Sequence, residues 1–134
     1  MIPKSTSAHI AADHVFPGIS NKIHGFSFRV PTTIVSSAVL NLILEKEIQR
    51  DELIELFQKV EDQQTYNVIK NSIEPLTSID YVGTNYSVII DQRWTKVEQK
   101  THVNLVYWYD NEWGYSSKVI DVIDVILKAK GFHE

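Results

Sequence analysis

The chain has 134 residues, a formal net charge of −4 and no cysteine. This length suffices for one domain with its own hydrophobic core, and the missing thiols exclude disulfides, thiolate metal sites and a cysteine nucleophile within the chain. Basic and acidic residues are interspersed and no apolar signal segment follows Met1, so we expect a cytoplasmic protein that binds neither nucleic acid nor a membrane.

The N-terminal part predicts a short helix followed by a strand. Thr6 or Ser7 can cap the helix, and a proline-glycine pair ends it. Free amides and the helix dipole favour an anion at such an end, although a plain cap is the commoner role. Alternating apolar residues predict a strand within 22–32. Arg29 near its end is either a solvated or ion-paired charge or a forked donor to phosphate.

The middle of the chain predicts a strand over 37–45, apolar on both faces and therefore covered on both sides, and an amphipathic helix over 47–64. Residues 66–74 are ambiguous and could form one helical turn. Further strands are expected in the segments 77–82, 86–93, 95–98 and 102–109. Such consecutive strands favour an α+β fold, with an antiparallel or mixed sheet and helices packed on one face, over a doubly wound one.

The corner between the last strand and the last helix is the most distinctive stretch. From Tyr107 to Ser116 it reads Tyr-Trp-Tyr-Asp-Asn-Glu-Trp-Gly-Tyr-Ser. Asp110 or Asn111 is the expected N-cap, because either side chain can accept from amides of the first helical turn. Small ligands are often held at such corners. The alternative is an ordinary strand-to-helix joint whose aromatic residues serve only for packing.

The last helix, expected over about 113–130, has an apolar band that is wider than a single stripe. The band consists of Val119, Ile120, Val122, Ile123, Val125, Ile126 and Leu127. So wide a band needs more than one neighbour to cover it, and we expect a partner domain or subunit to supply that cover.

Several kinds of site find no support in the sequence. There is no Gly-x-Gly-x-x-Gly or phosphate-loop pattern, so the chain does not itself form a dinucleotide-binding βαβ unit. No Gly-x-Ser-x-Gly elbow supports a serine triad. The histidines show no zinc-binding spacing and are expected to be solvated or in the core. They are His9, His14, His24, His102 and His133.

Four segments together resemble a known family. Residues 2–8 read Ile-Pro-Lys-Ser-Thr-Ser-Ala, residues 25–32 read Gly-Phe-Ser-Phe-Arg-Val-Pro-Thr, and residues 79–83 read Ile-Asp-Tyr-Val-Gly. These segments and the corner peptide resemble four motifs of the phosphorylating glyceraldehyde-3-phosphate dehydrogenases. In chain order the family motifs are Ile-Pro-x-Ser-Thr-Gly-Ala, Gly-x-x-x-Arg-Val-Pro-Thr, Asp-Phe-Val-Gly and a strand-end signature like residues 107–116. The resemblance covers almost the whole chain.

This resemblance implies that residues 1–134 are the C-terminal catalytic, or substrate, domain, and that the N-terminal dinucleotide-binding domain is absent from this chain. Thr6, Ser7 and Arg29 would hold phosphate, either of a sugar-phosphate aldehyde or inorganic. Asn111 would hydrogen-bond the nicotinamide carboxamide, with Tyr115 close to the ring. The complete enzyme would use NAD or NADP and would be a homo-oligomer, a tetramer in the family. Such contacts act mostly by orientation.

The chain departs from the family in ways that limit its chemistry. Ser7 stands where the family has glycine and could crowd a bound phosphate, and Ile10 stands where the family has lysine. The family's nucleophilic cysteine, which attacks the aldehyde before hydride leaves to NAD and phosphate cleaves the thioester, and its base histidine would precede Met1. We therefore expect no catalytic residue, no metal, no cofactor bound to the chain alone and no activity by the chain alone.

Two alternatives remain open. The first is a non-catalytic remnant that acts as an interaction or oligomerisation module. The second is a portion of an erythrose-4-phosphate dehydrogenase, although Ser5-Thr6 and Tyr109-Asp110-Asn111 look more like the glyceraldehyde type. The choice between NAD and NADP depends on an acidic residue that would lie in the other domain.

Overall fold

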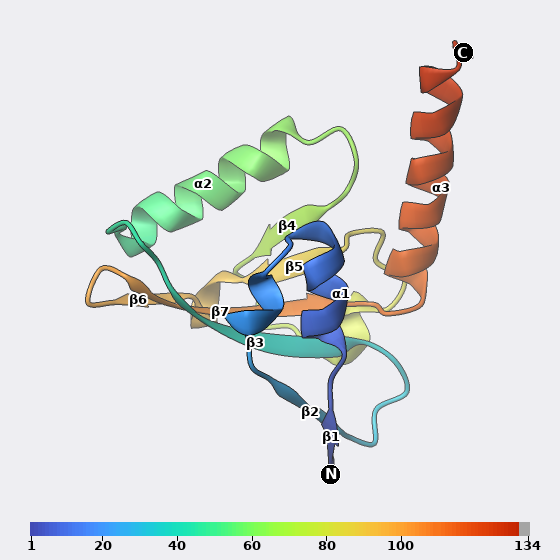
Figure 1. The fold of residues 1–134 in the computed structure, drawn as a ribbon. Coiled ribbons are helices and arrows are strands. Elements are labelled where there is room, and N and C mark those ends of the chain that lie inside the picture. Colours follow the sequence, from blue (N-terminus) through green and yellow to red (C-terminus); the bar gives the residue numbers. More distant parts are fainter. Residues whose placement is uncertain (132–134) are drawn as a thin grey trace. The chain divides into compact units, whose positions relative to one another are not determined.

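The structure, a computed structural model, describes residues 1–131 and divides into two compact units, Met1–Thr33 and Ile34–Glu134. Helices and strands follow one another irregularly, and the sheets contain antiparallel and parallel pairs (Figure 1). The predicted α+β class is therefore confirmed.

The first unit consists of a hairpin and a short helix. Strand β1 (Ile2–Ser5) pairs antiparallel with β2 (Phe26–Arg29), and α1 (Ala8–Val15) and the 3₁₀ helix η1 (Ile19–Asn21) lie between them in the chain. No described residue of this unit is fully buried. Strand β1 was not predicted, because its four residues include a proline and become a strand only by pairing with β2.

The second unit contains a mixed sheet of five strands in the order β3-β7-β5-β4, with β6 also paired to β7. Its strands are β3 (Ser36–Ile43), β4 (Ile69–Ser72), β5 (Val88–Asp91), β6 (Lys96–Glu98) and β7 (His102–Tyr109). Strands β3 and β7 are antiparallel over their full length, from the pair Ser36 and Tyr109 to the pair Ile43 and His102. Strand β5 is antiparallel to β7 and parallel to β4.

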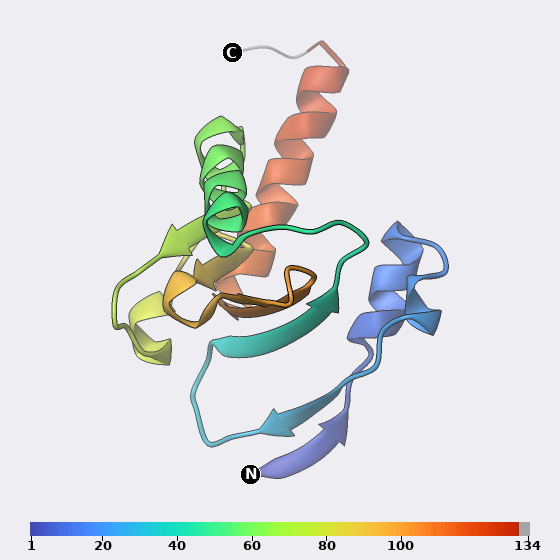
Figure 2. The ribbon, with the colours of Figure 1, turned by 90° about the vertical axis from the view of Figure 1, so that its left-hand side faces the viewer.

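Helix α2 (Arg50–Gln63) covers part of this sheet, as Figures 1 and 2 show. The helix is amphipathic, and its Leu53 is buried against Val103 and Leu105 of β7. At its start the carboxylate of Glu52 accepts from the backbone N–H of Gln49 at 2.8 Å, which satisfies one amide beside the first turn. The predicted helix over 47–64 is confirmed with a later start.

A second core cluster lies under the segment that joins β4 to β5. It consists of Val35, Tyr81 and Ile89, with Trp108 of β7 packed against them. The rings of Tyr81 and Trp108 stack at 5.4 Å between centroids. This cluster and the one below α2 together form the hydrophobic core of the described part of the unit.

Three sequence expectations in this unit are corrected by the structure. Residues 66–74 contain strand β4, which is set by its nonlocal pairing with β5, and not a helical turn. Residues 77–82 contain the 3₁₀ helix η2 (Ser78–Tyr81), since Asp80 accepts from the backbone N–H of Thr77 at 2.7 Å and nucleates a turn. The expected strand over 86–93 ends at Asp91, whose side chain accepts from the backbone N–H of Arg93 and starts η3 (Gln92–Trp94).

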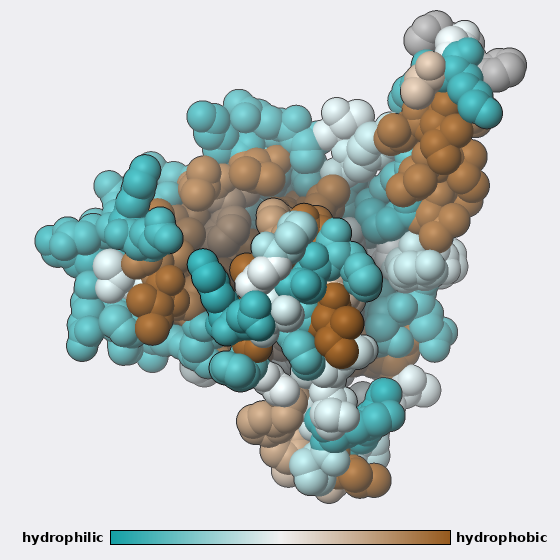
Figure 3. All heavy atoms as spheres, in the orientation of Figure 1, coloured by the Kyte–Doolittle hydropathy of each residue, from teal (hydrophilic) through white to brown (hydrophobic). Residues whose placement is uncertain are grey.

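Helix α3 (Trp113–Ala129) matches its predicted bounds and leaves its wide apolar band exposed. Ile120 and Val122, for example, are 64% and 57% exposed, and Figure 3 shows apolar side chains gathered along this helix. We expected both faces of the strand over 37–45 to be covered. The described residues do not cover both faces, because Val39 and Ile43 of β3 are 60% and 78% exposed. These two surfaces are available to other domains or subunits.

Candidate functional site

The corner between β7 and α3 is organised by the buried carboxylate of Asp110. Its Oδ1 accepts from the backbone N–H groups of Glu112 at 3.0 Å and Trp113 at 2.8 Å, and its Oδ2 accepts from that of Gly83 at 2.9 Å. Burial raises the pKa of Asp110, but these three amides outweigh it and hold the pKa below its ordinary value. The residue at the N-cap position is Glu112, whose side chain makes no capping bond, so neither predicted N-cap residue occupies that position; Asp110 nevertheless accepts from the amides that begin α3.

Polar contacts and a close backbone approach hold the first turns of α3 against the loop that precedes β5. Nε1 of Trp113 and Oγ of Ser117 both donate to the side-chain oxygen of Asn85, at 2.6 and 3.1 Å. A Cβ added to Gly114 would lie 3.1 Å from the backbone oxygen of Tyr86, so this close approach favours glycine. The start of the helix, and with it the corner, therefore has a defined position within the unit.

A cavity of about 330 Å³ opens at this corner. It is lined by Ser87, Tyr109, Asp110, Asn111, Gly114, Tyr115 and Lys118. Asn111 and Tyr115, both predicted from sequence, thus line the same cavity. Tyr115 is 72% exposed, and Lys118 donates to the backbone oxygen of Asn67 and pairs with Asp121. An amide beside an exposed aromatic ring can hydrogen-bond and pack against a planar heteroaromatic amide.

The predicted phosphate contacts lie in the first unit. Oγ1 of Thr6 accepts from the backbone N–H of Ala8 at 3.2 Å, which leaves its hydroxyl proton free to donate. Ser7 is the N-cap of α1, with φ −94°, and its side chain makes no capping bond. Since this φ is ordinary for a side-chain-bearing residue, serine fits the backbone in place of glycine.

Arg29 ends strand β2 and is exposed. The hairpin register pairs it with Ile2 and pairs Ser5 with Phe26, so Arg29 lies three residues, or roughly 10 Å, along the strands from Ser5. The structure therefore brings Thr6 and Ser7 together and places the backbone of Arg29 at the other end of the hairpin.

Sequence reasoning missed two polar residues of the corner site. Lys118 lines the cavity, and Ser36 of β3 donates from its Oγ to Oδ1 of Asn111 at 3.4 Å. Helical spacing from Gly114 and Tyr115 could have indicated Lys118. Nothing in the local sequence indicated Ser36, because its approach depends on the pairing of β3 with β7.

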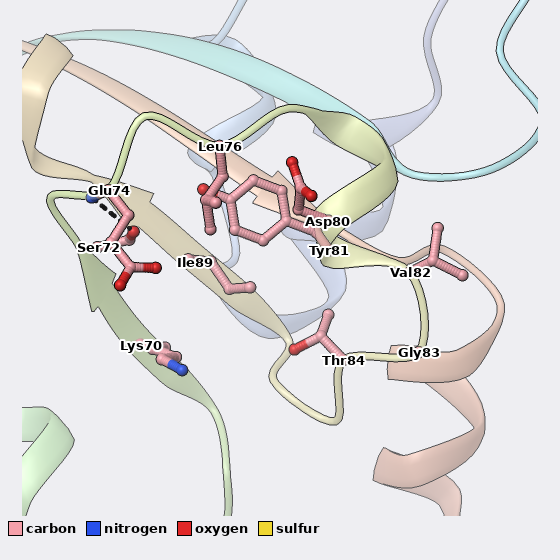
Figure 4. Close-up of a pocket in the computed structure, with 10 residues that line it drawn as sticks. All are labelled: Lys70, Ser72, Glu74, Leu76, Asp80, Tyr81, Val82, Gly83, Thr84 and Ile89. Carbon is pink, nitrogen blue, oxygen red and sulfur yellow. Dashed lines mark hydrogen bonds between the residues drawn. The ribbon is translucent and has the colours of Figure 1, made fainter.

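A second cavity of the same unit, of about 200 Å³, lies beside η2 and β4 (Figure 4). Tyr81 forms one wall, next to Leu76 and Ile89, and is only 4% exposed. Among the described residues, its hydroxyl oxygen has no hydrogen-bond partner. Burial raises the pKa of Tyr81, while the nearby Ser72 hydroxyl lowers it in part. Charges of both signs line this cavity, so its chemistry specifies no class of ligand.

Within residues 1–131, no group of three or more histidine, cysteine, aspartate or glutamate side chains is arranged to hold a metal ion. His133 lies outside the described residues. None of the helices described has both the length and the apolar character needed to cross a bilayer.

Comparison with known proteins adds a family match. A family model described as "Glyceraldehyde 3-phosphate dehydrogenase, C-terminal domain" matches residues 1–111. The glyceraldehyde-3-phosphate dehydrogenase 2 of Staphylococcus aureus (strain MRSA252) is 40% identical over 126 residues, which are 94% of this chain and 36% of that protein.

Two further relatives give the same picture. The glyceraldehyde-3-phosphate dehydrogenase 2 of Bacillus subtilis (strain 168) is 38% identical over 92% of this chain and 36% of its own length. A protein of Arabidopsis thaliana named glyceraldehyde-3-phosphate dehydrogenase GAPC2, cytosolic, is 39% identical over 96% of this chain and 38% of its own length. The chain thus spans a little over one third of these relatives.

Proposed function

The chain belongs to the glyceraldehyde-3-phosphate dehydrogenase family, as its C-terminal domain, and from this premise we propose that it supplies substrate and cofactor contacts to a phosphorylating aldehyde dehydrogenase of glycolysis. The complete enzyme would oxidise glyceraldehyde 3-phosphate with NAD and inorganic phosphate. The observation that carries the proposal is that Asn111 and Tyr115 line one cavity in a chain of this family.

The residues of the corner fit a nicotinamide group. Asn111 is exposed and offers both a donor and an acceptor to a carboxamide, and Tyr115 offers an exposed ring beside it. When bound, NAD supplies the hydride acceptor. The role of Asn111 is then to orient the carboxamide, and thus to select the ring face that meets the substrate, while Tyr115 packs near the ring and excludes water.

The phosphate contacts are proposed for the first unit. Its cationic side chains are Lys4, Lys22 and Arg29, against a single acidic residue, Asp13, which favours an anion there. Thr6 would donate its free hydroxyl proton, Ser7 its hydroxyl or backbone N–H, and Arg29 its guanidinium to phosphate oxygens. These groups would position the phosphorylated aldehyde and would not themselves react.

The proposed enzyme also needs parts that this chain does not provide. The reactive thiol and the dinucleotide-binding domain would be supplied by a further segment, because the chain has no cysteine and no Gly-x-Gly-x-x-Gly motif. We propose a cytoplasmic homo-oligomer, a tetramer as in the family. The exposed apolar band of α3 supports the proposal that another domain packs there. The same band also favours the second candidate, a non-catalytic interaction module.

A chimera tests the proposed function. This chain would replace the matching segment of the Bacillus subtilis relative, and NAD reduction would be followed with glyceraldehyde 3-phosphate and phosphate. We expect an active chimera in which Asn111→Ala raises the KM for NAD and Arg29→Ala raises the KM for phosphate or aldehyde. Lys59→Ala, an exposed cation of helix α2, is the control and should change neither.

Three results would count against the proposal. One is a folded chimera without activity, and another is an active chimera whose kinetics are insensitive to Asn111→Ala and Arg29→Ala. The third concerns the isolated chain, which we expect to be inactive for lack of a thiol. Reduction of NAD by the purified chain, free of host enzyme, would contradict that expectation.

A further inference from the structure

The side chain of Asn111 accepts a hydrogen bond from a residue outside its own strand and helix. Ser36 is the first residue of β3 and lies opposite Tyr109, two residues before Asn111. Its Oγ donates to Oδ1 of Asn111 at 3.4 Å. The contact joins residues 75 positions apart in the chain, so it exists only because β3 and β7 are paired in this register.

The backbone just before Ser36 is strained. Val35 has a φ of 72°, in the left-handed region that β-branched residues rarely adopt. Such a conformation costs on the order of 1–3 kcal/mol and persists only where the surroundings enforce it. The side chain of Val35 is 6% exposed and is packed with Tyr81 and Ile89, which anchors the strained turn in the core. Strain of this kind is concentrated at functional sites.

We propose that Ser36 is a positioning residue for Asn111, which it holds in the orientation that receives the nicotinamide carboxamide. This inference rests on the proposed function. Asn111 is exposed, and an exposed amide samples several rotamers unless a neighbour selects one. Donation by Ser36 selects one rotamer and still leaves the amide N–H groups and the second lone pair of Oδ1 free for a ligand.

The strained turn gives this contact its geometry. Val35 sets the path by which the chain enters β3, and the pairing of Ser36 with Tyr109 then places the hydroxyl beside the corner. The cost of ordering Asn111 is met in the folded protein, before a ligand arrives. Removal of the hydroxyl should therefore weaken binding by about two- to tenfold, the range for one neutral hydrogen bond.

The test has two parts: the purified 134-residue chain, labelled with ¹⁵N, is studied by NMR without ligand, and the chimera described above is titrated with NAD to give an affinity. The side-chain N–H₂ signals of Asn111, assigned by their loss in Asn111→Ala, report the orientation of the amide. In Ser36→Ala we expect these signals to shift in the free chain and the affinity to fall two- to tenfold. Ser36→Thr, which keeps the hydroxyl, should restore both.

Ser37→Ala is the matched control. Ser37 is the next residue of β3, so its side chain points to the opposite face of the strand, and within residues 1–131 it makes no side-chain hydrogen bond. We expect this variant to leave the signals and the affinity unchanged. Equal effects of Ser36→Ala and Ser37→Ala would show a general disturbance of the strand and would overturn the inference.

The two proposals fail differently. If Asn111→Ala weakens binding and Ser36→Ala does not, the inference about Ser36 is wrong and the proposed nicotinamide contact stands. If Asn111→Ala in the chimera binds NAD as well as the unmodified chimera does, the nicotinamide contact is refuted and this inference with it. Unchanged Asn111 signals in free Ser36→Ala refute the positioning contact without any ligand.

Discussion

The buried hydroxyl of Tyr81 leads to a prediction about the free energy of unfolding. The residue is 4% exposed, its ring stacks on Trp108, and its hydroxyl oxygen has no hydrogen-bond partner within residues 1–131. In Tyr81→Phe the ring keeps this packing and loses only the hydroxyl. We therefore expect the variant to be more stable than the unmodified chain.

The magnitude follows from desolvation. A buried polar group without a partner costs about 1–3 kcal/mol, because it has lost its bonds to water. Since the cavity beside Tyr81 is partly open, we take the lower end, about 1 kcal/mol. For a unit of this size, such a gain raises the unfolding midpoint by roughly 4–8 °C.

The assay is urea unfolding followed by tryptophan fluorescence and by circular dichroism. Trp108 lies in the same cluster as Tyr81 and reports its unfolding, whereas Trp94 and Trp113 are 56% and 55% exposed. We expect a higher midpoint with an unchanged slope, which indicates a change of stability and not of the surface exposed on unfolding. Coincident transitions by the two probes support a two-state analysis.

A loss of stability in Tyr81→Phe would refute this reasoning. It would show that the phenol has a partner, for which the nearby Ser72 is the candidate. The double variant with Ser72→Ala distinguishes the cases, because paired hydroxyls give a coupling energy and unpaired ones give additive effects. Phenylalanine at this position also matches the family motif Asp-Phe-Val-Gly.

Two further predictions concern the corner and the core. Asp110→Asn should destabilise the chain by about 1–3 kcal/mol, since an amide cannot accept from all three N–H groups. Because folding lowers the pKa of Asp110, the carboxylate stabilises the fold above its unfolded-state pKa, and this stabilisation is lost as the pH falls through its folded-state pKa. The free energies of unfolding of the unmodified chain and of Asp110→Asn should therefore converge as the pH is lowered. A constant difference between them at all pH values would contradict this. Leu53→Ala should lower the free energy of unfolding by about 2–5 kcal/mol. Leu56 lies on the same helix but is 51% exposed, so Leu56→Ala should lower it far less. Thermal unfolding measures both, and equal losses would contradict the assignment of Leu53 to the buried face of α2.

Periodic patterns predicted the longest elements because their signals are local. Helix α2, helix α3 and strand β7 appear close to their predicted bounds. The two helices show helical spacing of apolar residues over several turns, and the strand shows alternation over eight residues. The errors fall on short segments. Strand β4 exists only through its pairing with β5, and η2 follows from a Thr77–Asp80 capping contact that overrides strand-like composition.

The same division applies to the candidate site. The sequence alone determined the family and singled out Asn111 and Tyr115, because both lie in one contiguous peptide whose residues resemble a motif of that family. Only the tertiary structure decided that Asp110 accepts from the first amides of α3, that Val35 takes a left-handed backbone conformation, and that Ser36 reaches Asn111. These facts depend on contacts between distant strands and on core packing, which no local pattern of residues encodes.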